Sequence, residues 1–223
     1  MKAKSITLFL LLFSVAVSAQ NIANIWYETK ILEPIKGSNL VLDDAKVKIS
    51  FYKKYFISES TIDPTHSYLV DTRNKIRYRC NEKKQTYKQE TIDSTSGGVI
   101  TEYKDEVESA SETVNGYKAV KHHLTFKNEK QKLVYDLNVW VTEDIAIDSR
   151  FSPYVIGELF VVKIPFEVEG CIVKATADVS SKGKIISRGQ LDIAKSNNTP
   201  LSTFFFRKPS ERGFKREVGS SKK

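Results

Sequence analysis

The side chains best suited to acid–base or metal chemistry are three histidines. His66, His122 and His123 are the only histidines in the 223 residues. His122 and His123 are adjacent in a strand-like segment, so their side chains point to opposite faces and cannot readily bind one metal ion together. His122 falls on the apolar side of that segment, where we expect a core histidine with a local hydrogen-bond partner. The histidines therefore predict no metal site.

Short catalytic motifs are also missing from the sequence. It contains no Gly-x-Ser-x-Gly elbow, no His-Glu-x-x-His helix, no phosphate-binding loop and no dinucleotide fingerprint. Acidic residues between Glu102 and Glu112 are spread along one predicted strand, without the spacing of a calcium loop. We therefore expect a non-enzymatic protein without a cofactor.

Two cysteines, Cys80 and Cys171, leave two interpretations open. In an oxidising compartment an even number of cysteines favours a disulfide. Each cysteine also lies in a run of alternating apolar residues, so each could equally be a small buried core residue. The sequence does not show whether the two sulfurs meet.

The first nineteen residues have the order of a secretory signal peptide. Lys2 and Lys4 precede an apolar stretch from Ile6 to Val17, and the small residues Val17-Ser18-Ala19 form a cleavage site. The alternative is a retained membrane anchor, but the apolar run is short for a bilayer and no later segment could span one. We expect cleavage after Ala19 and an extracytoplasmic, periplasmic protein without a transmembrane segment. Loss of two lysines would lower the formal net charge from +8 to +6.

The remaining basic excess lies between Arg73 and Lys88 and in the tail from Arg207 to Lys223. A nucleic-acid site needs basic groups that share one face with aromatic stacking partners. Here the basic residues alternate with apolar ones, which is typical of the solvated side of a sheet. We therefore expect no nucleic-acid partner.

Alternation with period two is the strongest structural signal in the chain. Apolar residues at odd positions from Leu133 to Val141 share one face of a strand, and residues 120–126 alternate in the same way. A hairpin turn at 128–131 would bring these two strands together. Seven residues then form a candidate apolar ligand-binding face: Val120, Leu124, Phe126, Leu133, Tyr135, Leu137 and Val139. The structural alternative is that this face is ordinary core.

Other short alternating segments extend the pattern over the chain. They are residues 25–32, 47–51, 55–60, 67–71, 75–80, 85–91, 99–112, 171–179 and 184–194. Asn115-Gly116 and Lys182-Gly183 are tight-turn signals between neighbouring strands. Short connections predict an antiparallel meander in which neighbours in sequence are neighbours in the sheet.

One segment departs from this period. Apolar residues recur at helical spacing from Phe151 to Val162, Ser152 could cap a helix and Pro153 could occupy its first position. Gly157 weakens that helix and Pro165 stops it. A short helix and an irregular apolar loop remain equal alternatives, and either could cover one face of the sheet.

Four segments carry short motifs beyond the alternation itself. They are the first strand at Ile25-Trp26-Tyr27; the run Ser67-Tyr68-Leu69-Val70-Asp71 with Lys75-Ile76-Arg77-Tyr78 and Thr86-Tyr87; Asn115-Gly116-Tyr117-Lys118-Ala119 followed by Leu137-Asn138-Val139-Trp140-Val141-Thr142-Glu143-Asp144; and Phe204-Phe205-Phe206-Arg207-Lys208-Pro209 with Gly213-Phe214-Lys215. In these segments the chain resembles a family of uncharacterised secreted bacterial proteins grouped with the LolA/LolB-like lipoprotein-carrier superfamily.

The resemblance implies a mainly β fold, with a single antiparallel meander forming an incomplete, half-open barrel and one or two short covering helices. In the better-known carriers the concave face holds acyl chains. Those carriers have a helix before the first strand and a larger helical lid, whereas this chain has no such helix between Gln20 and Ile25. The fold can therefore carry over without the function.

Together these features predict a signal peptide at 1–19, an antiparallel β domain at 20–206 and a basic, flexible tail at 207–223. The expected function is a binding protein that holds a lipid, a lipidated molecule or another apolar ligand. The alternative is a structural protein of the cell envelope that meets a protein partner and has no small-molecule ligand.

Overall fold

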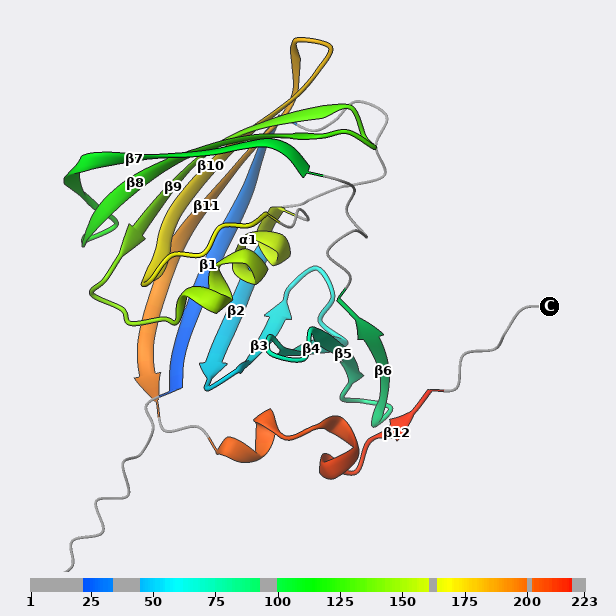
Figure 1. The fold of residues 1–223 in the computed structure, drawn as a ribbon. Helices are drawn as coiled ribbons and strands as arrows, with labels where there is room; N and C mark the ends of the chain where they lie inside the picture. The colour runs from blue at the N-terminus through cyan, green and yellow to red at the C-terminus, as the bar shows by residue number, and fades with distance from the viewer. Residues whose placement is uncertain (1–21, 34–44, 93–99, 161–163, 200–201, 218–223) are drawn as a thin grey trace, which may run out of the picture.

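The computed structural model describes residues 22–33, 45–92, 100–160, 164–199 and 202–217 (Figure 1). The strands are β1 (Ile22–Glu33), β2 (Ala45–Tyr52), β3 (Tyr55–Ser60), β4 (His66–Asp71), β5 (Ile76–Asn81), β6 (Thr86–Thr91), β7 (Ile100–Val114), β8 (Tyr117–Asn128), β9 (Leu133–Thr142), β10 (Cys171–Ser181), β11 (Lys184–Thr199) and β12 (Lys215–Arg216). The predicted signal peptide and its cleavage site lie outside the described residues.

All twelve strands belong to one sheet, in the order β12-β6-β5-β4-β3-β2-β1-β11-β10-β9-β8-β7. Both β1–β6 and β7–β11 are meanders of antiparallel neighbours, and antiparallel pairing of β1 with β11 joins the two halves. The strict meander prediction fails at two connections, because β6 and β7 lie near opposite edges of the sheet and β12 pairs with β6 instead of β11. With β7 at one edge and β12 at the other, the sheet stays open, so the predicted half-open, mainly β fold is confirmed.

Residues with positive φ make the two tight turns that the sequence indicates. Asn115 and Gly116 have φ of 51° and 84°, and Lys182 and Gly183 have φ of 49° and 73°. Positive φ at both central residues is the geometry of a type I′ hairpin turn, which matches the twist of the flanking strands. These turns set the register of β7 against β8 and of β10 against β11.

A short helical segment covers the concave face of the sheet (Figure 1). It consists of η1 (Ser149–Phe151), α1 (Ser152–Phe160) and, beyond it, an irregular stretch at 164–170. Val155 and Ile156 of α1 are buried in the main hydrophobic cluster, and the Phe151 ring lies 5.1 Å from that of Phe51. Of the two alternatives for this segment, a short helix or an irregular loop, the structure has the helix, at residues 152–160.

The helix begins differently from the prediction that Ser152 caps it. Asp148 caps the preceding turn, because its side chain accepts a hydrogen bond from the Arg150 amide. The Ser152 hydroxyl instead donates to the Val168 carbonyl oxygen over 2.8 Å. Ser152 thereby ties the start of the helix to the irregular stretch that follows it.

A second cluster lies on the opposite face of β3–β6. Alternation separates the two clusters, since Val70 belongs to the main cluster and its neighbour Leu69 to the second. Two aromatic residues from the C-terminal segment, Phe206 and Phe214, cover Leu69 and complete the second cluster. The elements of that segment are η2 (Thr203–Phe206), η3 (Pro209–Arg212) and β12, which pairs in parallel with β6.

Residues 207–217 thus differ from the expected flexible tail. Within it Pro209 is buried and Phe214 is only 6% exposed, and Phe206 just before it is 3% exposed, so the segment packs on the sheet. The Arg212 guanidinium stacks 4.7 Å from the Phe214 ring and forms a 2.9 Å ion pair with Glu82. The sequence pattern emphasised the charges of this segment and missed its two anchors.

A partly buried carboxyl group holds the turn before β4 against β5. Asp63 accepts hydrogen bonds from His66 Nδ1 at 2.8 Å and from Arg79 at 3.1 Å. Burial raises the pKa of Asp63, but these hydrogen bonds outweigh burial and lower it to about 2.

None of the helices in the described residues has the length and hydrophobicity of a membrane-spanning helix.

Candidate ligand-binding cleft

The seven-residue apolar face is mostly filled by the protein itself. Leu124, Leu137 and Val139 have no exposed surface, and Phe126 is 1% exposed. The Phe126 ring stacks on the Tyr135 ring at 4.7 Å. All five belong to the main cluster with α1, so these residues form packed core and leave no open groove between them. The remaining two, Leu133 and Val120, are only partly buried.

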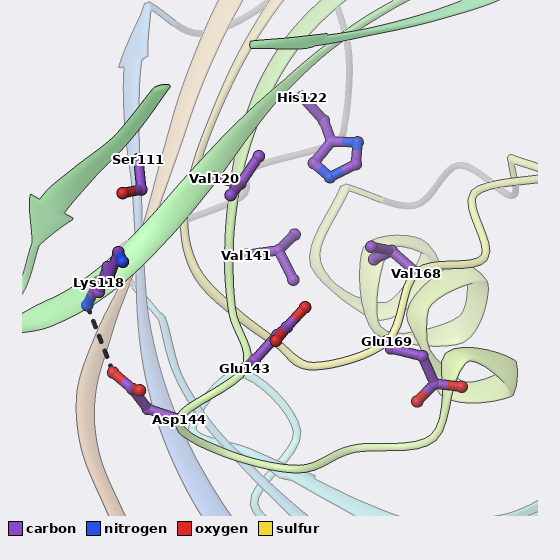
Figure 2. Close-up of a pocket in the computed structure, with 9 residues that line it drawn as sticks. All are labelled: Ser111, Lys118, Val120, His122, Val141, Glu143, Asp144, Val168 and Glu169. Carbon is purple, nitrogen blue, oxygen red and sulfur yellow. Dashed lines mark hydrogen bonds between the residues drawn. The ribbon is translucent and has the colours of Figure 1, made fainter. Parts of the chain in front are cut away.

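Open space begins where this face reaches the end of the sheet. A cavity of about 470 Å³, here termed the Val120 pocket, lies between β8, the end of β9 and the irregular stretch. Its lining residues are Ser111, Lys118, Val120, His122, Val141, Glu143, Asp144, Val168 and Glu169 (Figure 2). Val120, alone of the seven predicted residues, contributes to it. The three valines make an apolar floor, and the charged residues make a polar rim.

Two further cavities adjoin the Val120 pocket along the same end of the sheet. One of about 550 Å³ shares Asp144 with it and is lined mainly by polar groups from the ends of β1 and β11. The next, of about 290 Å³, shares Ala23 and Ala146 with the second and reaches Phe51. The three cavities follow one another beside the loop 143–148 and are here together termed the cleft.

His122 fixes the inner wall of the Val120 pocket. Its side chain is 10% exposed, and its Nδ1 lies 3.1 Å from Asp105 Oδ1. The Phe166 ring packs edge-on against the imidazole, with the ring centroids 5.2 Å apart. The prediction of a core histidine with a local partner is confirmed, and the same side chain also lines the pocket.

An aspartate–histidine pair next to a serine raises the question of nucleophilic catalysis. Ser111 lines the same pocket, but it is paired with Val120 in the β7–β8 register, while His122 is paired with Val107. Among the described residues the hydrogen bonds of His122 go to Asp105 and none joins it to Ser111, so no contact between a nucleophile and its base is formed here. No cluster of three metal-binding side chains occurs within the described part of the chain.

The two cysteines are small buried core residues, which is the second of the two interpretations that the sequence left open. Cys80 and Cys171 are free and buried, in the second and the main cluster respectively. The Cys171 sulfur lies 3.6 Å from the Tyr27 hydroxyl. Burial raises the pKa of Cys80 to about 11 and that of Cys171 to about 12. Such thiols are packing residues and weak nucleophiles.

Sequence reasoning missed the rim of the cleft. Glu143 and Asp144 follow the end of β9, where alternation stops, and Glu169 precedes the next strand. Gly170 allows the backbone before β10 to pass close to the end of β9. At its φ of 104°, an added Cβ would lie 2.3 Å from the Thr142 carbonyl oxygen. Acidic residues at both ends of the connection between β9 and β10 were the available signal.

Comparison with known proteins finds similar folds among solved structures. No protein-family model matches the sequence, and no curated protein matches it. The crystal structure of a LolA superfamily protein from Nitrosomonas europaea is similar, with 8% sequence identity and a TM-score of 0.36. The match covers 86% of this chain and 92% of that chain. It is the superfamily that the sequence motifs resemble, and at this similarity it assigns no ligand and no residue role.

Proposed function

We propose that the protein is a non-enzymatic binding protein that works outside the cytoplasm and holds a lipid or another ligand with an apolar chain. The observation that supports this proposal is the cleft, in which an apolar floor continuous with the core meets a polar rim. Val120, Val141 and Val168 would contact the chain, and the rim would contact a polar end group. Each methylene that leaves water contributes about 0.8 kcal/mol, so a chain of many methylenes is needed to exceed the free-energy cost of association.

Filling the Val120 pocket tests this proposal. Val168 lies in the irregular stretch and is partly exposed, so Val168→Trp should occupy the pocket without disturbing a strand. Val134→Trp is the matched control, because Val134 is 39% exposed and its neighbours Leu133 and Tyr135 point to the other face of β9. Circular dichroism would verify that both variants fold.

Binding of twelve-carbon amphiphiles would be measured by titration calorimetry below their micelle concentration. Val168→Trp should weaken binding at least about tenfold, which corresponds to about 1.4 kcal/mol, and Val134→Trp should leave it unchanged. Equal binding by both variants would place the ligand elsewhere. Native mass spectrometry of protein purified from its own compartment would show whether a lipid-sized adduct accompanies it.

A second candidate, association with an envelope surface, has its own supporting observation. On the outer face of the sheet Trp26 lies between Lys48 and Lys195, with the ammonium groups 5.9 and 5.1 Å from the ring. Trp140 lies in the same way between two lysines of β8 and β10. Tryptophan and lysine are favoured where proteins meet a membrane interface.

Sedimentation with vesicles containing anionic lipid tests the second candidate. Replacing Trp26 and Trp140 with alanine should reduce the bound fraction if this face contacts the membrane. Binding that is equal in the variant and in the unchanged protein would remove the outer face from consideration. Cleft binding of soluble amphiphiles should be unaffected by these substitutions, which separates the two candidates.

A further inference from the structure

Two basic regions that lie far apart in the sequence meet in the fold, and neither supplies a described lining residue of the cleft. The Lys215 amide donates to the Gln85 carbonyl oxygen over 2.9 Å, where β12 pairs with β6. The turn before β6 contains Lys83 and Lys84, which are both exposed. In Figure 1 the segment that leads to β12, coloured orange to red, runs up to β6. The fold thus places the basic C-terminal segment beside a basic turn.

An exposed aromatic pair lies in the same C-terminal segment. Phe204 and Phe205 are 43% and 47% exposed, and their ring centroids lie 6.2 Å apart. Of the six large apolar side chains that are exposed in the described ranges, these two are the only aromatic ones and the only neighbours in sequence. A single exposed apolar side chain needs no explanation, whereas contiguous ones with a polar rim mark a contact surface.

The aromatic pair is held against the sheet and next to the basic turn. Phe206, the next residue, is buried in the second cluster. The Arg212 side chain is only 6% exposed, and its guanidinium donates to the Phe205 carbonyl oxygen at 3.5 Å and to Glu82 at 2.9 Å. Because Glu82 directly precedes Lys83, Arg212 joins the aromatic pair to the turn between β5 and β6.

Positive charge surrounds the pair. Residues 202–217 include five basic and two acidic residues. The Arg207 guanidinium lies 5.7 Å from the Phe204 ring. Four cations of this region form no ion pair within the described part of the chain, whereas Arg77 of β5 pairs with Glu90 at 2.8 Å. These four cations and the aromatic pair are here termed the Phe204 patch: Lys83, Lys84, Phe204, Phe205, Arg207 and Lys208.

We infer that the Phe204 patch is a docking surface for a membrane that contains anionic lipids. The basic groups would contact lipid phosphates, and the two rings would enter the boundary between head groups and acyl chains. A nucleic acid fits this surface less well, because a stacking base needs a free ring face and Arg207 already lies over Phe204. The patch shares no residue with the cleft or with the tryptophans of the outer face. The inference therefore goes beyond the proposed ligand binding and does not depend on it.

Sedimentation of the mature protein with vesicles tests the inference. Vesicles of equal parts phosphatidylglycerol and phosphatidylcholine are compared with vesicles of phosphatidylcholine alone. Partitioning into the anionic vesicles should be at least about tenfold stronger, because each basic residue near an anionic surface contributes. Added salt should reduce the difference.

A serine variant tests the aromatic pair. Phe204→Ser/Phe205→Ser should weaken partitioning into the anionic vesicles at least about tenfold, because the exposed half of each ring no longer leaves water. Val107→Ser/Ile185→Ser is the matched control, since these side chains of β7 and β11 are 58% and 44% exposed. The control should change partitioning less than about twofold.

A glutamine variant tests the basic turn. Lys83→Gln/Lys84→Gln should weaken partitioning at least about tenfold and should lower its dependence on salt. Lys182→Gln/Lys184→Gln removes the same charge from the turn between β10 and β11 and should change partitioning less than about twofold. All four lysines are exposed, and circular dichroism would verify that each variant folds.

The outcomes are separate from those of the proposed function. Equal partitioning into the two kinds of vesicle, or losses no larger for the patch variants than for their controls, would overturn the inference. A loss on replacing Trp26 and Trp140, with none in the patch variants, would assign membrane contact to the outer face and also overturn it. So would tighter binding to a single-stranded oligonucleotide than to the anionic vesicles at the same salt concentration. Amphiphile binding in the cleft should be unchanged in the patch variants.

Discussion

Replacing Leu137 with alanine tests whether the concave face is packed core. Leu137 has no exposed surface, lies in the middle of β9 and belongs to the main cluster. The substitution removes three carbon atoms, worth about 2.4 kcal/mol at about 0.8 kcal/mol each. A cavity that collapses only partly raises the expected loss of stability to about 3–5 kcal/mol. The matched control is Val134→Ala on the other face of the same strand, where Val134 is 39% exposed and the loss should be below about 1 kcal/mol.

Urea unfolding monitored by circular dichroism measures both losses. The unfolding midpoint of Leu137→Ala should fall sharply while the denaturant slope stays constant, because the folded structure remains the same. A loss below about 1 kcal/mol for Leu137→Ala would refute the packing described above. It would mean that Leu137 borders an open cavity, so that the ligand chain binds deeper than the Val120 pocket.

Three further outcomes follow from the backbone and the buried titratable groups. Cys80 and Cys171 should resist thiol reagents at pH 8 in the folded protein and react after unfolding; fast labelling of the folded protein would contradict their burial. In the same urea assay, Gly170→Ala should lower the free energy of unfolding by about 3 kcal/mol or more, because positive φ and a clash with the β9 backbone add together. Gly116→Ala should lower it by only about 1 kcal/mol, because that position has the backbone strain without the clash. Asp63→Asn should cost about 1–2 kcal/mol at pH 7. Because the folded-state pKa of Asp63 is lowered to about 2, that difference should be complete above pH 4 and disappear as pH falls toward 2; a difference independent of pH would contradict the role of the charge.

The strands could be predicted because alternation is a local property. The odd residues of β9 are apolar and its even residues are mostly polar, and the structure buries four of the five odd residues. The Asn115-Gly116 turn could also be predicted from the sequence, because its positive φ angles depend on two adjacent residues alone. These signals need no knowledge of distant parts of the chain.

The cleft could not be predicted because it depends on where strands end in space. Leu137 and Val120 have the same sequence pattern, yet one is fully buried in the main cluster and the other borders a cavity. Which of them is covered depends on the segment after Phe151, whose placement relative to the sheet no periodicity encodes. Cys80 and Cys171 were ambiguous for the same reason, since only the fold assigns them to separate clusters.

The pairing of β1 with β11 has a consequence for how the chain folds. Residues 22 and 199, near the two ends of the chain, are direct partners at the centre of the sheet. Until β11 is available, β1 has an unpaired edge that can associate with another chain. Closing so long a loop before its contacts form is slow, so folding should take milliseconds to seconds. A chain that emerges from its N-terminus would thus remain incomplete along this central seam until nearly all of it has emerged.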